Sequence, residues 1–293
     1  MPLVSMASMT WLGVGGQASW VYHPHDPDDL ARVLRLWPRN YPVYVLGAGS
    51  NLLVRDGGLD GLVIKLGRGF RQFVRQTEGL FLGAGLLNRY VTQQCQVLGL
   101  GGLDFMNTIP GTIGGGLAMN AGCYGSCFAD HVVWARVMDP QGNVCDLSVS
   151  DLGYGYRTCQ LAPGWLFLGA LFRVSPEDPL AIAERMNLFS AHRENTQPLQ
   201  VKTGGSTFAN PPQASAWSLI DAAGFRGQVL GDAQFSDKHC NFLINRGSAT
   251  AWQLETLADR ARQSVKELSG IDLHWEIVRW GNQASDQAID CGH

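Results

Sequence analysis

The chain has 293 residues, of which 45% are hydrophobic and 16% charged, and its formal net charge is −3. This composition predicts a globular protein with one large domain or two or three small ones. The weak negative charge gives no electrostatic reason to expect nucleic acid or an anionic membrane as a partner. No apolar run reaches about eighteen residues, and the N-terminus lacks the pattern of a signal peptide, so we expect neither a transmembrane helix nor a secretion signal.

Cysteine and glycine usage narrow the class further. The seven cysteines are scattered, odd in number and without a CxxC pair, which predicts reduced thiols in a cytoplasmic protein. Neither they nor the seven histidines show metal-ligand spacing, so we expect no metal site. Glycine accounts for 36 residues, well above the usual share of roughly 7%. The glycines lie beside apolar residues without a period, which indicates tight turns and close backbone approaches.

The first 66 residues predict a small α/β unit. "ASWVYHP" alternates as a strand, and "DPDDLARVLRLW" predicts a helix with Asp26 as N-cap and Pro27 at its first position. "PVYVLGAGSNLLV" predicts a strand, a glycine turn and a second short strand, and "GLVIKLG" predicts another strand.

Residues 67–175 predict a second, strand-rich unit. Residues 70–84 have the pattern of a hairpin, and a helix is expected to end at Gly99. The glycine-rich stretch 107–125 follows. "HVVWARVMDPQGNVCDL" predicts a hairpin with its turn at "DPQGN", and "WLFLGALFRV" predicts a buried strand.

Residues 176–281 predict a C-terminal α/β unit. "PLAIAERMNLFSAHREN" predicts an amphipathic helix, "SAWSLIDAAGF" a helix closed by Gly224, and "HCNFLINRG" a strand. A long amphipathic helix is expected to stop at Gly270, followed by a final strand, "IDLHWEIVRWG". Residues 282–293 are expected to form a loose tail.

The segment "GAGSN", from Gly47 to Asn51, follows a predicted strand and allows three interpretations. A Rossmann fingerprint would need a third glycine and a following helix, whereas Leu52 and a short strand come next. A plain hairpin turn is a second possibility. The third is a nest in which successive backbone N–H groups bind an anion without a helix.

The uncharged segment "NTIPGTIGGGLAMNAGCYG", residues 107–125, offers the same chemistry at greater length. A flexible linker would not need its apolar residues, which leaves a buried structural turn or a loop whose bare backbone contacts a ligand through its N–H groups. Two glycine loops without a P-loop lysine suit a dinucleotide cofactor better than a nucleoside triphosphate.

Several motifs, in order along nearly the whole chain, resemble those of the MurB family, the UDP-N-acetylenolpyruvoylglucosamine reductases. "VLGAGSNLLVRDGGLDGLVIKL" and the segment after "GGLDF" resemble its flavin-binding half. "YGYRTC", "KTGGSTFANP", "AWSLIDAAGFRG", "AQFSDKHCNFLIN" and "LHWEIVRWG" resemble its later motifs. The short spacing between them is similar to the compact branch of the family that lacks an extra substrate-capping loop.

This resemblance implies an α+β fold. An FAD-binding fold of the vanillyl-alcohol-oxidase type in two subdomains, residues 1–66 and 67–175, would be followed by a C-terminal α/β substrate-binding domain, residues 176–281. It also implies the cofactors FAD and NADPH and a reaction in which NADPH reduces FAD. The reduced flavin then converts the enolpyruvyl ether of UDP-N-acetylglucosamine into the lactyl ether of UDP-N-acetylmuramate, for peptidoglycan synthesis. The enzyme would be a UDP-N-acetylmuramate dehydrogenase, and we expect it to be cytoplasmic and monomeric.

The resemblance also implies site residues. Arg157 would bind the substrate carboxylate, Ser206 would donate a proton, and Glu276 would assist. Of these, Glu276 alone stands out without the resemblance, as a charge in an otherwise apolar predicted strand. The substrate would contact Tyr124, Asn210, Arg226 and His239. The cofactor would contact Gly47, Ala48, Gly49, Ser50, Asn51, Leu52, Pro110, Gly111, Thr112, Ile113, Gly114, Gly115, Asn120, Ala121 and Gly122.

The chain departs from the family pattern at three positions. Ala209 replaces a lysine, for which Lys202 is a candidate substitute, Cys159 replaces a serine, and Gly13 stands where a basic residue is common. Two alternatives stay open. One is an FAD-dependent oxidase on the same fold, and the other is a flavin-binding relative without catalytic activity.

Overall fold

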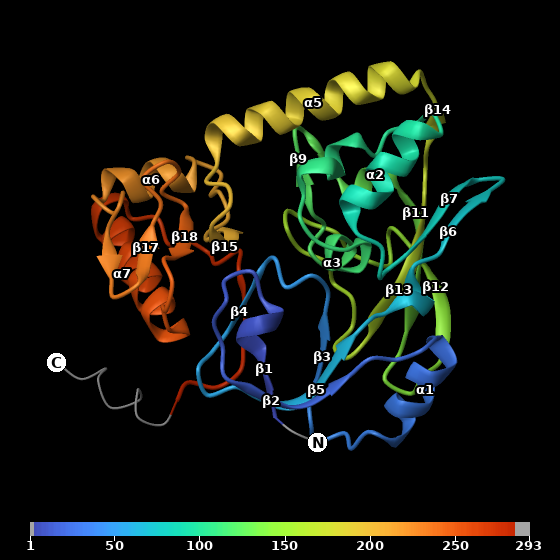
Figure 1. Ribbon diagram of the computed structural model, residues 1–293, viewed down its shortest axis with the longest axis horizontal. Coiled ribbons are helices and arrows are strands. Elements are labelled where there is room, and N and C mark those ends of the chain that lie inside the picture. The colour runs from blue at the N-terminus through green and yellow to red at the C-terminus, as the bar shows by residue number, and fades with distance from the viewer. Residues whose placement is uncertain (1–2, 285–293) are drawn as a thin grey trace. The chain divides into compact units, whose positions relative to one another are not determined.

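The computed structural model describes residues 3–284, and its elements fall into two compact units (Figure 1). The first unit consists of three segments: the residues up to Trp20, residues Gly49–Asp60, and the residues from Glu194 onward. The second takes Val21–Ala48 and Gly61–Arg193. The chain first crosses between the units within β2 (Gln17–Tyr22), and it crosses again after Ala48 and within β5 (Leu59–Lys65). Both units therefore draw on the first 66 residues, which were predicted to form one subdomain.

The described part of the first unit combines short sheets with α-helices. Its four-stranded antiparallel sheet has the order β15 (Lys202–Ser206), β18 (Phe242–Asn245), β17 (Ala233–Phe235), β16 (Val229–Leu230). Strand β4 (Leu52–Val54) pairs in parallel with β19 (Val278–Trp280), and β1 (Val4–Ser5) pairs with β2. The remaining elements are η1 (Met6–Met9), α6 (Ala216–Ala222) and α7 (Ala251–Ser269). One core of this unit includes Phe208, Phe235, Leu254 and Ile277.

The second unit is built on a five-stranded antiparallel sheet. Its order is β12 (Val144–Ser148), β11 (Val132–Met138), β13 (Leu166–Phe172), β7 (Gly79–Gly83), β6 (Phe73–Gln76). All seven residues of the central strand β13 are buried, as its continuous apolar pattern predicts. Strand β3 (Val43–Leu46) pairs in parallel with β5.

Short pairs of strands and several helices complete this unit. The pairs are β8 (Leu100–Gly101) with β14 (Ser175–Pro176), and β9 (Gly122–Cys123) with β10 (Ser126–Cys127). The helices are α1 (Pro27–Leu36), η2 (Arg68–Phe70), α2 (Asn88–Val97), η3 (Asp104–Thr108), α3 (Ile113–Ala118), α4 (Phe128–His131) and α5 (Pro179–Thr196). Helix α5 continues past Arg193, where the chain enters the first unit.

Most predicted elements are confirmed, including their end signals. The Asp26 side chain accepts a hydrogen bond from the Asp29 backbone at the start of α1. Gly270 ends α7 in the left-handed conformation, with φ of 72°, where a side chain would be strained. No helix within the described residues is long and apolar enough to cross a membrane.

Four predictions need correction. The glycine-rich segment contains a helix, α3, where we expected a loop. Helix α5 forms, but without a continuous apolar face, because Ile182 and Met186 are buried while Leu180 and Leu188 are exposed. The final strand is shorter than expected and begins at Val278. Strands β15, β16 and β17 were not predicted, because they are short and glycine or polar residues interrupt their alternation. Of the predicted loose tail, residues 285–293 lie outside the described residues.

Candidate active site

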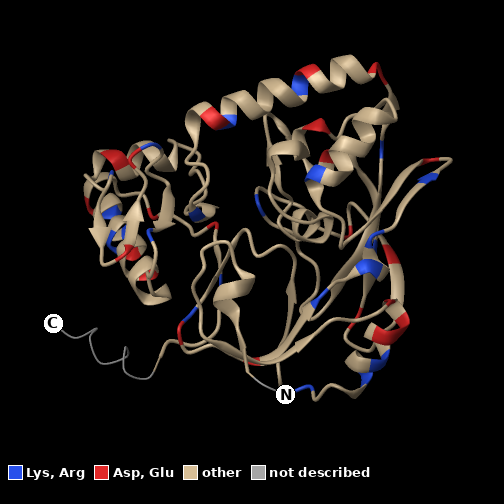
Figure 2. Cartoon of the chain, viewed as in Figure 1, with Lys and Arg blue, Asp and Glu red and all other residues tan. Residues whose placement is uncertain are grey.

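A cavity of about 450 Å³ lies within the second unit, and both glycine motifs reach it. Gly47 and Ala48 line it from the end of β3, and Thr112, Gly114 and Gly115 line it from the start of α3. The segment around α3 carries no charge, as its tan ribbon shows (Figure 2). A cavity of this size, mostly apolar with a few polar groups, has the character of a ligand site.

The two motifs meet at Gly47 and Thr112. A Cβ atom at Gly47 would lie 2.7 Å from the hydroxyl oxygen of Thr112, closer than any normal contact. That hydroxyl cannot move away freely, because it accepts a hydrogen bond from the backbone N–H of Gly115 and caps α3. Glycine at 47 is therefore a steric requirement of the cavity wall.

Gly47→Ala is expected to lower the free energy of unfolding by about 1–3 kcal/mol, as overpacking at a fixed contact does. Denaturant unfolding measures the change. Gly67→Ala is the matched control, because a Cβ there would meet only the Pro24 carbonyl oxygen, at 3.8 Å. Equal stability of the two variants would contradict the steric role of Gly47.

The predicted cofactor residues differ in whether their backbone N–H groups already donate a hydrogen bond within the fold. Those of Ile113, Gly114 and Gly115 already donate to the Leu86 carbonyl, the Ala84 carbonyl and the Thr112 hydroxyl. The N–H group of Ala48 has no acceptor among the described residues. The "GAGSN" turn is thus the better candidate for an anion-binding nest, and the N–H groups at the start of α3 hold the fold instead.

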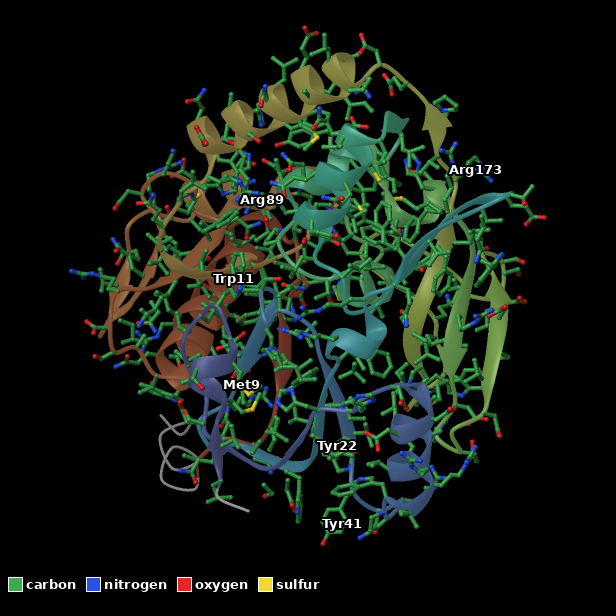
Figure 3. All side chains as sticks on the ribbon, turned by 45° about the vertical axis from the view of Figure 1, so that its right-hand side comes forward. Met9, Trp11, Tyr22, Tyr41, Arg89 and Arg173 are labelled. Carbon is green, nitrogen blue, oxygen red and sulfur yellow. The ribbon has the colours of Figure 1, made fainter. Side chains whose placement is uncertain are left out.

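In the first unit, Gly49 is fixed by its neighbours. Its φ is +69°, its carbonyl accepts a hydrogen bond from the backbone of Trp11, and a Cβ would lie 2.2 Å from the carbonyl oxygen of Met9. Met9 and Trp11 are labelled in Figure 3. Asn51 donates its side-chain amide to the Glu276 carbonyl at 3.0 Å and accepts from the Val278 backbone. These two hydrogen bonds of Asn51 position the chain around Glu276.

The structure brings Ser206 and Glu276 into neighbouring segments of the first unit. Ser206 is the last residue of β15, and the Glu276 backbone N–H donates to the carbonyl of Thr207 at 2.8 Å. The β15–β18 register shifts between Thr203 and Ser206, across two glycines. A bulge of this kind re-aims the next side chain. Ser206 and Glu276 are both half-buried, as suits groups that must reach a ligand.

Arg157 belongs to the second unit and has an unusual backbone. Its φ is +57°, and it sits with Tyr156 at the tip of a tight turn closed by hydrogen bonds between Gly155 and Thr158. Its guanidinium donates to the Gly122 carbonyl and lies over the Tyr156 ring. Among the described residues, four non-glycine residues have positive φ: Asn120, Tyr124, Arg157 and Gln200. Such conformations concentrate at functional sites. Three of the four residues, Asn120, Tyr124 and Arg157, are predicted site residues, which supports a functional site in this region.

Asn120 and Gly122 support this turn. The Asn120 side chain donates to the Gly155 carbonyl and accepts from the Ala129 backbone, so both of its polar atoms are engaged within the protein. A Cβ at Gly122 would lie 2.5 Å from the Ser126 carbonyl oxygen. Of the other predicted cofactor residues, Pro110, Gly111, Ile113 and Ala121 do not line the cavity.

Tyr124 lies against the last turns of α5. Its ring stacks on Phe189 with 4.1 Å between centroids, and its hydroxyl donates to the Phe189 carbonyl. Arg193 is close by, and burial lowers the pKa of its guanidinium although Tyr124 and Cys123 oppose the shift. Sequence reasoning missed Arg193, because nothing in the pattern of α5 separates it from a surface charge.

The other predicted substrate residues are largely engaged within the first unit. Asn210 accepts from the Ala216 backbone at the start of α6. Arg226 forms a two-pronged ion pair with Asp221 and also donates to the Asp237 carbonyl. Burial lowers the pKa of His239, whose Nδ1 is buried without a partner among the described residues.

The three departures from the family pattern have defined surroundings. Lys202 donates to the Gly247 carbonyl, and its stem lies 3.1 Å from where a Cβ at Gly13 would be. The Ala209 backbone donates to the His274 carbonyl. Cys159 lines the cavity, and burial raises the pKa of its thiol.

Comparison with known proteins identifies the family. Residues 18–148 match the model of an FAD binding domain, and residues 197–280 match that of the UDP-N-acetylenolpyruvoylglucosamine reductase C-terminal domain. A UDP-N-acetylenolpyruvoylglucosamine reductase from Paramagnetospirillum magneticum is 49% identical over 94% of this chain and 90% of its own. A reductase of the same name from Phenylobacterium zucineum is 50% identical over 94% of this chain and 93% of its own.

A solved structure gives the same result. The UDP-N-acetylenolpyruvylglucosamine reductase (MurB) of Thermus caldophilus superposes with a TM-score of 0.84 at 33% identity, over 96% of this chain and 98% of its own. The predicted fold class, an FAD-binding fold followed by a C-terminal substrate-binding domain, is thereby confirmed. The chain belongs to the MurB family of UDP-N-acetylenolpyruvoylglucosamine reductases.

Proposed function

We propose that this chain is an FAD- and NADPH-dependent reductase that converts the enolpyruvyl ether of UDP-N-acetylglucosamine into UDP-N-acetylmuramate. The observation that carries the proposal is identity of 49% along 94% of the chain to a reductase of that name. Such a reaction serves peptidoglycan synthesis. We also propose that the enzyme is cytoplasmic and that it acts as a monomer on a UDP-sugar.

The cavity of the second unit suits the cofactor. Glycine backbone and apolar side chains form most of its wall, and Trp165 adds an aromatic ring. Ala48 offers an N–H group that has no acceptor within residues 3–284. These features match a dinucleotide, which presents flat rings and an anionic diphosphate. We assign Gly47, Ala48, Thr112, Gly114 and Gly115 to its binding, and when bound, FAD supplies the hydride that it received from NADPH.

The chemistry asks for two kinds of protein group. Hydride adds to the terminal carbon of the enolpyruvyl double bond, and negative charge then develops on the carboxylate side. Arg157 is our candidate for binding that carboxylate, since its guanidinium is planar and permanently charged. Ser206 is our candidate for delivering a proton to the other carbon, which completes the lactyl ether. The hydride brings both electrons and one hydrogen, and the proton from Ser206 brings the second hydrogen, so the double bond is fully reduced.

Glu276 would support Ser206. The Glu276 backbone is hydrogen-bonded to Thr207, the residue after Ser206, so the two side chains start from adjoining segments. A carboxylate there can hold a proton for the serine directly or through a water. Tyr124, Asn210, Arg226 and His239 stay our candidates for binding the substrate. Because Arg226 is paired with Asp221, it would have to exchange that partner for a ligand.

A steady-state assay tests the proposal. NADPH consumption by the purified, FAD-loaded protein should depend on the enolpyruvyl substrate, and mass spectrometry should show a product heavier by two hydrogens. Reduction of the flavin by a hydroxylated substrate and its reoxidation by oxygen, without turnover of the enolpyruvyl ether, would favour an oxidase on the same fold. A protein that binds FAD but shows neither activity would favour the non-catalytic alternative.

A further inference from the structure

The charge lining the cavity of the second unit is entirely positive. Of its lining residues, two are charged, Lys65 and Arg71, and none is Asp or Glu. Arg71 is exposed, whereas Lys65 is half-buried. The charge of Lys65 in particular therefore favours an anionic ligand, because a charge removed from water needs a partner.

Among the residues that the structure describes, Lys65 has no such partner. It is the last residue of β5 and is half-buried. Its ammonium donates one hydrogen bond, to the Gly47 carbonyl at 3.3 Å, and has no carboxylate partner among the described residues. An ammonium has three N–H donors, so two remain. Burial lowers the pKa of Lys65, in agreement with this small number of partners.

The one hydrogen bond fixes where this charge lies. Gly47 opens the "GAGSN" turn, and the next residue, Ala48, has the N–H group without an acceptor. The ammonium and this N–H group therefore adjoin the same turn. A compact ammonium beside a backbone nest is a common arrangement for phosphate.

We propose that Lys65 binds the diphosphate of FAD and provides the counter-charge that the glycine turn lacks. The diphosphate is the anionic part of the cofactor, while the remaining cavity wall suits its rings. This inference rests on the proposed function for the identity of the cofactor, and it gives the family's uncharged glycine loop a charged partner from a neighbouring strand.

Equilibrium binding of FAD to the apo-protein tests the proposal. Lys65→Met keeps the aliphatic stem and removes the charge, and it should raise the Kd for FAD by roughly 10- to 100-fold, the usual effect of losing a charge-assisted hydrogen bond. Its Kd should also respond less to salt than that of the wild type. Lys65→Arg should restore most of the affinity and the salt response. Thermal unfolding of the apo-variants checks that the fold is intact.

Two results would overturn this role. One is a Kd for Lys65→Met within about twofold of the wild-type value. The other is weaker binding with an unchanged salt response, which would mean that Lys65 only holds the Gly47 carbonyl. Failure of the wild-type protein to bind FAD at all would instead count against the proposed function, so the two failures are distinguishable.

Discussion

Ser206→Ala is expected to slow reduction of the enolpyruvyl substrate on the order of 10²- to 10⁴-fold, the usual contribution of a positioned proton donor. Reduction of the bound flavin by NADPH should keep its wild-type rate, because that step needs no proton from the serine. Anaerobic stopped-flow absorbance of the flavin separates the two half-reactions in one instrument.

The matched control is Ser218→Ala, which removes a hydroxyl of the same unit that hydrogen-bonds to Ser215 at the start of α6. Both half-reactions should be normal in that variant. Equal slowing of both half-reactions by Ser206→Ala would show that the serine holds the fold or the cofactor, and the proton donor would have to be sought elsewhere.

Glu255→Ala is expected to lower the free energy of unfolding by about 3–5 kcal/mol, the usual cost of removing one partner from a buried ion pair. The Glu255 side chain is 7% exposed and receives hydrogen bonds from Arg55, at 2.8 and 3.0 Å, and from Arg279. Without Glu255, the guanidinium groups of Arg55 and Arg279, which connect β4 and β19 to α7, would lose their carboxylate partner. Urea unfolding measures the change.

Asp146→Ala is the control for this ion pair. Asp146 also meets an arginine, Arg136, through two hydrogen bonds, but both side chains are 42% exposed, so the expected loss is about 0–1 kcal/mol. A similar loss in both variants would contradict the structural importance of the Glu255 cluster.

The effect of Glu255 should also depend on pH. Burial alone would raise the pKa of Glu255, but hydrogen bonds and charge from Arg55 and Arg279 outweigh it and hold the pKa below its usual value. The stabilisation is therefore complete above the ordinary glutamate pKa and is lost as pH falls through the lower, folded-state pKa. The difference between wild type and Glu255→Ala should shrink in acid.

Local signals made most of the fold predictable. Asp26 and Pro27 mark the start of α1, Gly270 marks the end of α7, and the apolar run of β13 marks a buried strand, each through chemistry confined to a few residues. The failures share a different cause. The glycines of α3 disfavour a helix locally, yet Thr112 caps it, the Gly114 N–H donates to the Ala84 carbonyl, and the Phe128 ring packs against Gly116. Such contacts are not visible in a local pattern.

The residues of the candidate site also differ in how far the sequence alone could identify them. Glu276 stood out by its charge among apolar residues, and Arg157 and Ser206 needed the family resemblance. Lys65 could not be found, because a lysine at a strand end is ordinary until β3 and β5 pair and bring it to the Gly47 carbonyl. The resemblance pointed to both glycine motifs, whereas the fold shows that they differ: the N–H groups at the start of α3 are engaged, and that of Ala48 has no acceptor among the described residues.

A single anaerobic cycle tests the central claim most directly. NADPH should bleach the visible absorbance of the bound flavin, and one equivalent of the enolpyruvyl ether of UDP-N-acetylglucosamine, added without oxygen, should restore it and yield one equivalent of the lactyl ether. A flavin that NADPH bleaches but that only oxygen restores would contradict the assignment as a reductase of this substrate.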